Sequence, residues 1–182
     1  LGARVTPAVP AQPVRYLEGH CLAYGNTMPY LPVLDLLRAC CGILPSDSPA
    51  VMTAHVRLGL QTAGIDPDEG EPYLLPLLGV HTRLDRLAGL SPEMRRAQTF
   101  ATLRQLLLHS TAWHPLVLAV ENLHWIDPTS EAFLAALVES LAGTRCLVLT
   151  TYRPGYRPPW MEKSYVAQMV LPPFTSQDSR AA

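Results

Sequence analysis

The chain has 182 residues, an apolar fraction of 48% and a net charge of -1, which suit one globular domain with a substantial core. Balanced charge gives no indication of a nucleic-acid or membrane-surface partner, and no apolar run approaches the length of a bilayer span. The four cysteines lack the spacing of a zinc site and predict buried free thiols in a cytoplasmic protein.

The first half of the chain predicts one strand followed by helices. In chain order we expect a strand over 14–20, a helix from Pro29 and Pro32 to about 39, a helix to about 63, an acidic turn-rich stretch over 64–72 and a short apolar helix over 73–79. Ser48 and Pro49 mark the start of the second helix, because serine is a preferred N-cap and proline suits the first helical position.

The second half predicts alternating helices and strands. A helix should begin at Ser91-Pro92-Glu93, with one apolar face and one polar face. The apolar face comprises Met94, Ala97, Phe100, Ala101, Leu107 and Leu108, and the polar face comprises Arg95, Gln98, Thr102 and Gln105. Strands over 116–121, 145–151 and 166–171 and a helix over 129–141 complete the order. Strand–helix alternation predicts an α/β protein with a parallel sheet.

The most informative segment runs from Leu116 to Ser130, Leu-Val-Leu-Ala-Val-Glu-Asn-Leu-His-Trp-Ile-Asp-Pro-Thr-Ser. Its unbroken apolar start is typical of a central strand in a parallel sheet. Glu121 then falls at the carboxyl end of that strand, where such sheets bind ligands. An acid at this position can hold Mg²⁺ directly or through water, as a nucleotide site requires.

The chain has no phosphate-binding loop to accompany this acid. Such a loop needs two glycines five residues apart followed by Lys-Ser or Lys-Thr, whereas the lysine of this chain, Lys163, follows Glu162 without that pattern. We therefore expect that the sequence begins after its phosphate loop, the alternative being that the loop has been lost. In either case residues 1–182 should bind ATP weakly or not at all.

Four segments of the chain, taken in sequence order, resemble one protein family. They are Arg15-Tyr-Leu-Glu-Gly-His-Cys-Leu-Ala-Tyr-Gly25, Pro29-Tyr-Leu-Pro-Val-Leu-Asp-Leu-Leu37, Glu121-Asn-Leu-His-Trp-Ile-Asp-Pro-Thr-Ser130 and Leu149-Thr-Thr-Tyr-Arg-Pro154. Together they resemble the ATPase module of STAND-class, AAA+-related NTPases. The version they resemble occurs in large bacterial regulators, beside adenylate or guanylate cyclase domains or LuxR-type DNA-binding domains.

The resemblance assigns roles to individual residues. Glu121 matches the Walker B acid associated with Mg²⁺. Asn122 stands where many relatives carry a second acid that polarises water; an amide can orient water but cannot accept its proton, which implies slow hydrolysis. The alternative is that Asn122 only shapes the strand end. Arg153 matches the sensor 1 position, where its guanidinium could report the γ-phosphate; the alternative is a surface arginine.

Other polar residues favour structural interpretations. His124 and Trp125 are expected to pack locally, and Asp127 or Thr129 should cap the following helix. His20 has no partner at metal-ligand spacing in the sequence, so we expect no metal site beyond the Mg²⁺ associated with Glu121.

The resemblance also implies a domain plan, a three-layer P-loop NTPase-like parallel sheet that is incomplete because its first strand and P-loop are absent. Residues 1–175 would form the partial ATPase core, and 176–182 the start of a truncated lid. In the family topology the missing strand lies between those matching 145–151 and 166–171. We therefore expect a gap beside 145–151, or closure of 166–171 across it, and exposed apolar side chains on one sheet face.

The function implied is a switch module that binds ATP and Mg²⁺ and hydrolyses ATP slowly within a signalling or transcriptional regulator. Its partners would be the nucleotide and the attached effector and sensor domains, with a homo-oligomer possible and no direct nucleic-acid or membrane contact. The intact parent would be an ATPase, and this chain alone would be inactive. The alternative is a non-catalytic, degenerate NTPase-fold scaffold; an α/β hydrolase is disfavoured because no Gly-x-Ser-x-Gly elbow exists.

Overall fold

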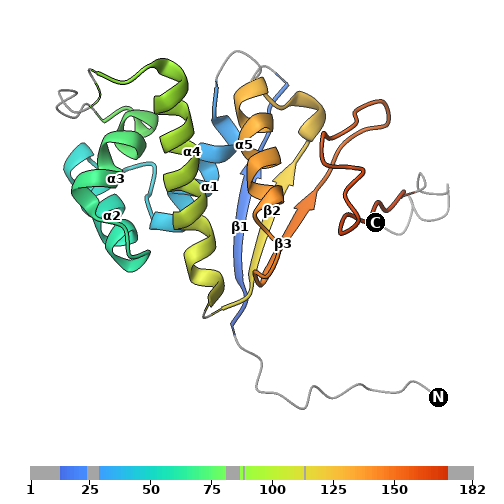
Figure 1. Ribbon diagram of the computed structural model, residues 1–182, viewed down its shortest axis with the longest axis horizontal. Coiled ribbons are helices and arrows are strands. Elements are labelled where there is room, and N and C mark those ends of the chain that lie inside the picture. Colours follow the sequence, from blue (N-terminus) through green and yellow to red (C-terminus); the bar gives the residue numbers. More distant parts are fainter. Residues whose placement is uncertain (1–12, 24–28, 81–86, 88, 113, 172–182) are drawn as a thin grey trace.

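The computed structural model describes residues 13–23, 29–80, 87, 89–112 and 114–171 (Figure 1). Its elements in chain order are β1 (Arg15–His20), α1 (Leu31–Cys41), α2 (Pro49–Thr62), α3 (Pro67–Leu74), η2 (Leu75–Leu78), α4 (Pro92–His109), η4 (Ser110–Ala112), β2 (Leu116–Glu121), η5 (Leu123–Trp125), α5 (Pro128–Glu139) and β3 (Cys146–Thr150). The α/β class predicted from the alternation is confirmed.

The described strands form a three-stranded parallel sheet in the order β1-β2-β3. Arg15 pairs with Leu116 and His20 with Glu121 at the two ends of the first ladder, and Leu116 pairs with Cys146 at the start of the second. The strands expected over 14–20, 116–121 and 145–151 are therefore confirmed. All three carboxyl ends lie at one edge of the sheet, which is the upper edge in Figure 1.

Helices α1, α4 and α5 contact one another and cover one face of this sheet, while α2 and α3 pack beside α4 (Figure 1). The core joins alternate strand residues to these helices and includes Leu17, Leu118, Val120, Leu36, Leu37, Leu103, Leu107, Phe133 and Leu134. None of the helices in the described part of the chain combines the length and the apolar character needed to cross a bilayer.

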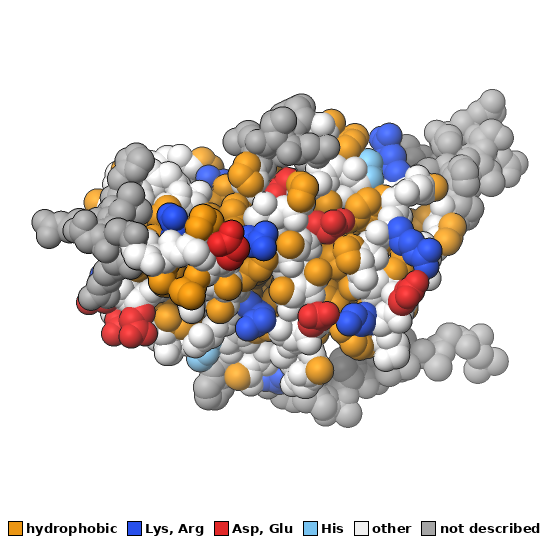
Figure 2. Space-filling model, turned by 45° about the horizontal axis from the view of Figure 1, so that its top comes forward, with side chains coloured by type: hydrophobic (Ala, Val, Ile, Leu, Met, Phe, Trp, Pro, Cys, Tyr) orange, Lys and Arg blue, Asp and Glu red, His pale blue; other side chains and the backbone are white. Residues whose placement is uncertain are grey.

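The other face of the sheet is open in the described residues. Tyr16, Leu147 and Leu149 alternate with the covered positions, and they are 56%, 60% and 51% exposed. Among the described strands β3 pairs with β2 alone, so the expected gap beside β3 and the expected apolar exposure are both observed. Figure 2 views the molecule obliquely from the carboxyl ends of the strands, and on this side acidic and basic side chains are interspersed among hydrophobic ones.

The strand predicted over 166–171 is wrong. This segment forms no bridge to another described strand, and Met169, Val170 and Leu171 are at least 80% exposed. An apolar run becomes a strand only where a neighbour pairs with its backbone, and here the run does not reach the free edge of β3.

The helix starts predicted at Ser48-Pro49 and at Ser91-Pro92 are confirmed, whereas the apolar helix expected over 73–79 is instead the end of α3 followed by the 3-10 helix η2. Two further details in the helical region are wrong. Ser48 caps α2 by accepting a hydrogen bond from the Val51 N–H, as expected. The stretch over 64–72, expected to be turns, contains most of α3, because Asp66 and Pro67 provide a cap and a first helical residue.

The buried face of α4 is rotated from the predicted one. Met94, expected inside, is 53% exposed, while Thr99 and Thr102 are buried. The two threonines can be buried because each hydroxyl donates a hydrogen bond to the carbonyl four residues earlier, which satisfies the polar group within the helix.

Gly19 allows α1 to approach β1 closely. A Cβ at this position would lie 2.5 Å from the carbonyl oxygen of Pro32, which is backbone and cannot swing aside. We therefore predict that Gly19→Ala lowers the free energy of unfolding by ~1–3 kcal/mol, measured by urea denaturation. Gly89→Ala is the matched control, because nothing lies within 4 Å of its Cβ position. Equal urea midpoints for the two variants would contradict the contact.

Candidate functional site

The candidate site is built where the three strands end. The Cys21 N–H donates to the Glu121 carbonyl at 3.0 Å, and the Leu123 N–H donates to the Thr151 carbonyl at 2.8 Å. These bonds extend the pairing one step beyond the regular strands and hold the three loops together. The structure thus places Glu121 at the carboxyl end of the central strand, the position expected from the sequence.

The carboxylate of Glu121 is half-buried on the open face of the sheet. Because the strands are in parallel register, Glu121 lies opposite His20, and Glu18 lies two residues earlier on the same face of β1. Ligand atoms of Glu18, His20 and Glu121 all lie within 4.8 Å of one another. The expectation that His20 has no partner is therefore wrong, since the fold joins residues about one hundred positions apart in the sequence.

Asn122 occupies the left-handed region, with φ 59° and ψ 42°. Asparagine adopts this conformation more readily than most residues because its short polar side chain suits it. The backbone N–H of Asn122 also donates to the hydroxyl of Thr151 at 3.1 Å. This geometry accounts for an Asn at the strand end.

Arg153 follows β3 and lies at the same edge of the sheet. Its guanidinium carbon lies 5.4 Å from the centre of the Trp125 ring, a cation–π distance. Trp125 in turn packs against His124, with ring centres 4.4 Å apart. Within the described residues neither ring nitrogen of His124 has a hydrogen-bond partner, so its observed role is packing, as expected.

Asp127 provides the helix cap that the sequence predicts. One carboxylate oxygen accepts from the N–H groups of Thr129 and Ser130 at 3.0 and 2.9 Å. The residue is only 3% exposed. Burial, with Asp127 and then Asp35 contributing, raises the pKa of Cys21 to about 12, which keeps the thiol protonated at neutral pH.

Two contacts of the segment after β3 attach it to α5. The hydroxyl of Tyr156 donates to the Glu131 carboxylate at 2.5 Å, and burial together with this bond raises the pKa of Tyr156. The ammonium of Lys163 pairs with the Glu139 carboxylate at 3.2 Å. The lysine is thus engaged on α5.

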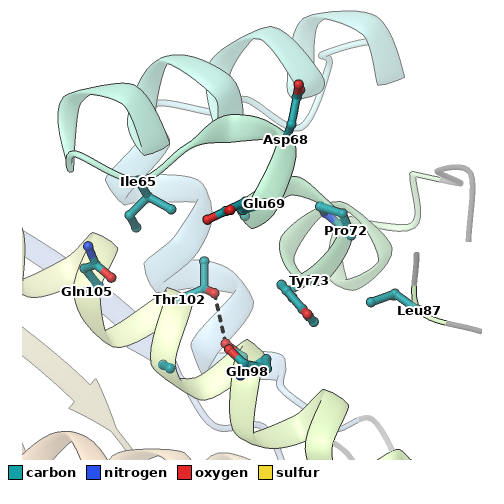
Figure 3. A pocket seen from close by; sticks show the side chains of 11 residues that line it. Ile65, Asp68, Glu69, Pro72, Tyr73, Leu87, Gln98, Thr102 and Gln105 are labelled. Atoms are coloured by element: carbon teal, nitrogen blue, oxygen red, sulfur yellow. Dashed lines mark hydrogen bonds between the residues drawn. The ribbon is translucent and has the colours of Figure 1, made fainter. Parts of the chain in front are cut away.

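A cavity of about 510 Å³ lies between α3 and α4, with polar side chains of the two helices facing each other across it (Figure 3). Two of its polar side chains are engaged within the protein, since the Thr102 hydroxyl donates to the Gln98 carbonyl and Asp68 pairs with Arg57. None of its lining residues belongs to a strand, so it is separate from the strand-end site.

A parallel sheet with an acid at the carboxyl end of its central strand, followed by a capped helix, is consistent with an incomplete P-loop NTPase-like α/β fold. The chain belongs to the AAA ATPase domain family, which it matches over residues 2–149. A 68-residue segment is 38% identical to an uncharacterized protein, R02095, of Rhizobium meliloti (strain 1021). That match covers 37% of this chain and 7% of that protein. No solved structure matches the chain.

The backbone of Asn122 generates a stability prediction. Asn122→Ala should lower the free energy of unfolding by ~1 kcal/mol, because alanine enters the left-handed region at a steric penalty that glycine avoids. Asn122→Gly should remain within a few tenths of a kcal/mol of the parent. Urea denaturation of both variants measures the difference, and an Ala variant as stable as the Gly variant would show that the turn relaxes without strain.

Proposed function

We propose that this chain is part of an ATP-dependent switch module in which Glu121 holds the Mg²⁺ of the bound nucleotide. The observation that carries the proposal is the position of Glu121, at the carboxyl end of the central strand in a chain of the AAA ATPase domain family. The chemistry of the residue fits the ion, since Mg²⁺ prefers carboxylate and water oxygens. Among the described residues no hydrogen bond or ion pair engages the Glu121 carboxylate, so its oxygens are available for an ion.

The neighbours of Glu121 support a slow reaction. Asn122 can orient the attacking water through its amide but cannot remove the proton, so positioning and charge stabilisation would supply most of the rate. Arg153 would pair with the γ-phosphate and report its loss. Its present partner, the Trp125 ring, provides a resting position that a phosphate could displace, because a full ion pair is stronger than an exposed cation–π contact.

A slow NTPase suits a switch that passes its nucleotide state to attached domains. We place this module, of the STAND class, within a larger signalling or transcriptional regulator that carries the phosphate loop, the effector and the sensor. The one relative reported above supports a larger parent, because the matched segment is only 7% of that protein. The nucleotide is the direct partner, and self-association of the parent is compatible with this scheme.

A second candidate is a non-catalytic scaffold with a degenerate NTPase fold. It is favoured by Asn122, whose left-handed backbone gives the residue a structural role, and by the absence of a Gly-rich phosphate motif from residues 1–182. In this case Glu121 would be an ordinary strand-end acid.

Site-directed variants of a protein that carries this segment together with a phosphate loop distinguish the two candidates. Glu121→Gln should reduce Mg²⁺-dependent ATP turnover by about a hundredfold, since it removes a charge worth several kcal/mol from the surroundings of the metal. Asn122→Asp should raise turnover by adding a proton acceptor. Glu162→Gln, a highly exposed acid paired only with Arg157 among the described residues, is the control. A parental rate for Glu121→Gln would favour the scaffold.

Calorimetry provides a complementary test on residues 1–182 themselves. ATP with Mg²⁺ should show no micromolar binding, because this sequence lacks the backbone cradle and the lysine that supply most phosphate affinity. Micromolar affinity would place the phosphate site elsewhere in this chain.

A further inference from the structure

The cluster of Glu18, His20 and Glu121 is not explained by the nucleotide scheme. Glu18 and His20 lie on β1, which is an edge strand, and the parallel register places His20 directly opposite Glu121. The side chains of His20 and Glu18 are 48% and 38% exposed, so an ion from solvent can reach them. Three ligand atoms within 4.8 Å of one another can converge on a single ion after small side-chain movements.

Asp35 orients the imidazole of His20 from the other side. This residue lies on α1, and its Oδ2 accepts a hydrogen bond from the backbone N–H of His20 at 3.2 Å. The same oxygen lies 3.5 Å from Nδ1 of the ring, while Nε2 lies 3.7 Å from the Glu18 carboxylate. A carboxylate near one ring nitrogen and a second ligand group near the other is an arrangement that metal-binding histidines use, because the first carboxylate supports the orientation of the ring.

The charges of the cluster also favour a cation. Glu18 and Glu121 are brought together on one face, and the third acid, Asp35, stands behind the imidazole. Arg38 approaches Asp35 through its other oxygen, at 3.9 Å, and so leaves the oxygen near His20 in place. A divalent ion placed among the three ligand atoms would offset the repulsion between the two neighbouring carboxylates.

We propose that Glu18, His20 and Glu121 bind a divalent first-row transition-metal ion such as Zn²⁺, with Asp35 as a positioning residue. The nitrogen ligand decides the class of metal, since imidazole suits Zn²⁺ and its transition-metal neighbours, whereas Mg²⁺ and Ca²⁺ select oxygen ligands. Three protein ligands and positions left to water are typical of accessible zinc sites.

This site goes beyond the proposed function because it requires no nucleotide. Glu121 belongs both to the proposed Mg²⁺ site of the nucleotide and to the proposed transition-metal site, whereas Glu18 and His20 belong only to the transition-metal site. A transition-metal ion held here would therefore withdraw Glu121 from the nucleotide-bound Mg²⁺. Failure of one proposal leaves the other standing, since Glu18→Gln changes the metal cluster alone.

Nuclear magnetic resonance of the imidazole nitrogens tests the site without nucleotide. Zn²⁺ added to the reduced 182-residue chain at pH 7.5 should shift the Nε2 resonance of His20 at stoichiometric metal and fix the tautomer protonated at Nδ1. The resonance of His114, an exposed histidine just before β2 at the opposite edge of the sheet, serves as an internal control and should not respond at that concentration. Zinc taken up by thiols does not disturb this measurement, because the signal belongs to one residue.

Three variants complete the test, with the other imidazole resonances verifying the fold of each. Glu18→Gln and Glu121→Gln should weaken Zn²⁺ binding at His20 by at least about tenfold, and Asp35→Asn by about tenfold to a hundredfold, the effect of removing such a supporting carboxylate. Glu162→Gln should bind like the parent. The proposal is overturned if His20 responds no more strongly than His114, or if Glu18→Gln and Glu121→Gln bind Zn²⁺ at His20 like the parent.

Discussion

The position of β2 between two parallel partners is the constraint on which the rest of the structure depends. Its backbone is paired on both sides, so its direction and register also fix those of β1 and β3. The residues assigned to the nucleotide site, Glu121, Asn122 and Arg153, then lie at or just after the carboxyl ends of strands, and no loop needs to be long to bring them together. The bond from the Leu123 N–H to the Thr151 carbonyl continues this control past the end of β2.

The same sheet has two unlike faces. Helices bury Leu17, Leu118 and Val120, while Tyr16 and Leu149 remain about half exposed on the other side. Ala119 is buried although it lies on the open face, where it is flanked in register by Glu18 and Leu149. The unbroken apolar run of β2 predicted a strand buried on both faces. On the open face Ala119 meets that prediction because its side chain is small and its neighbours in register are larger.

The sequence predicted best where a signal is local. The caps at Ser48 and Asp127 and the apolar run before Glu121 each act within a few residues, and all were found. Errors arose where packing against other elements decides. Among the described residues the run over 166–171 pairs with no strand. The packing of α4 selects a face that includes Thr99 and Thr102, whose hydroxyls are satisfied within the helix. The grouping of Glu18 and His20 with Glu121 depends on inter-strand register. Their i, i+2 spacing on a strand was the one available sign that they share a face.

The amide at Asn122 can be understood from its surroundings. Aspartate enters the left-handed region about as readily as asparagine, so the backbone alone does not select between the two. Charge favours asparagine over aspartate, because Glu121 is the adjacent residue and Glu18 contributes a second carboxylate on the same face of the sheet as Glu121. A further acid at this edge would raise the repulsion unless a cation were bound permanently. An amide keeps a polar group beside Glu121 without that repulsion, so the strand end remains stable whether or not an ion is present. Under the proposed function the same amide would also slow hydrolysis, because it cannot accept a proton from the attacking water.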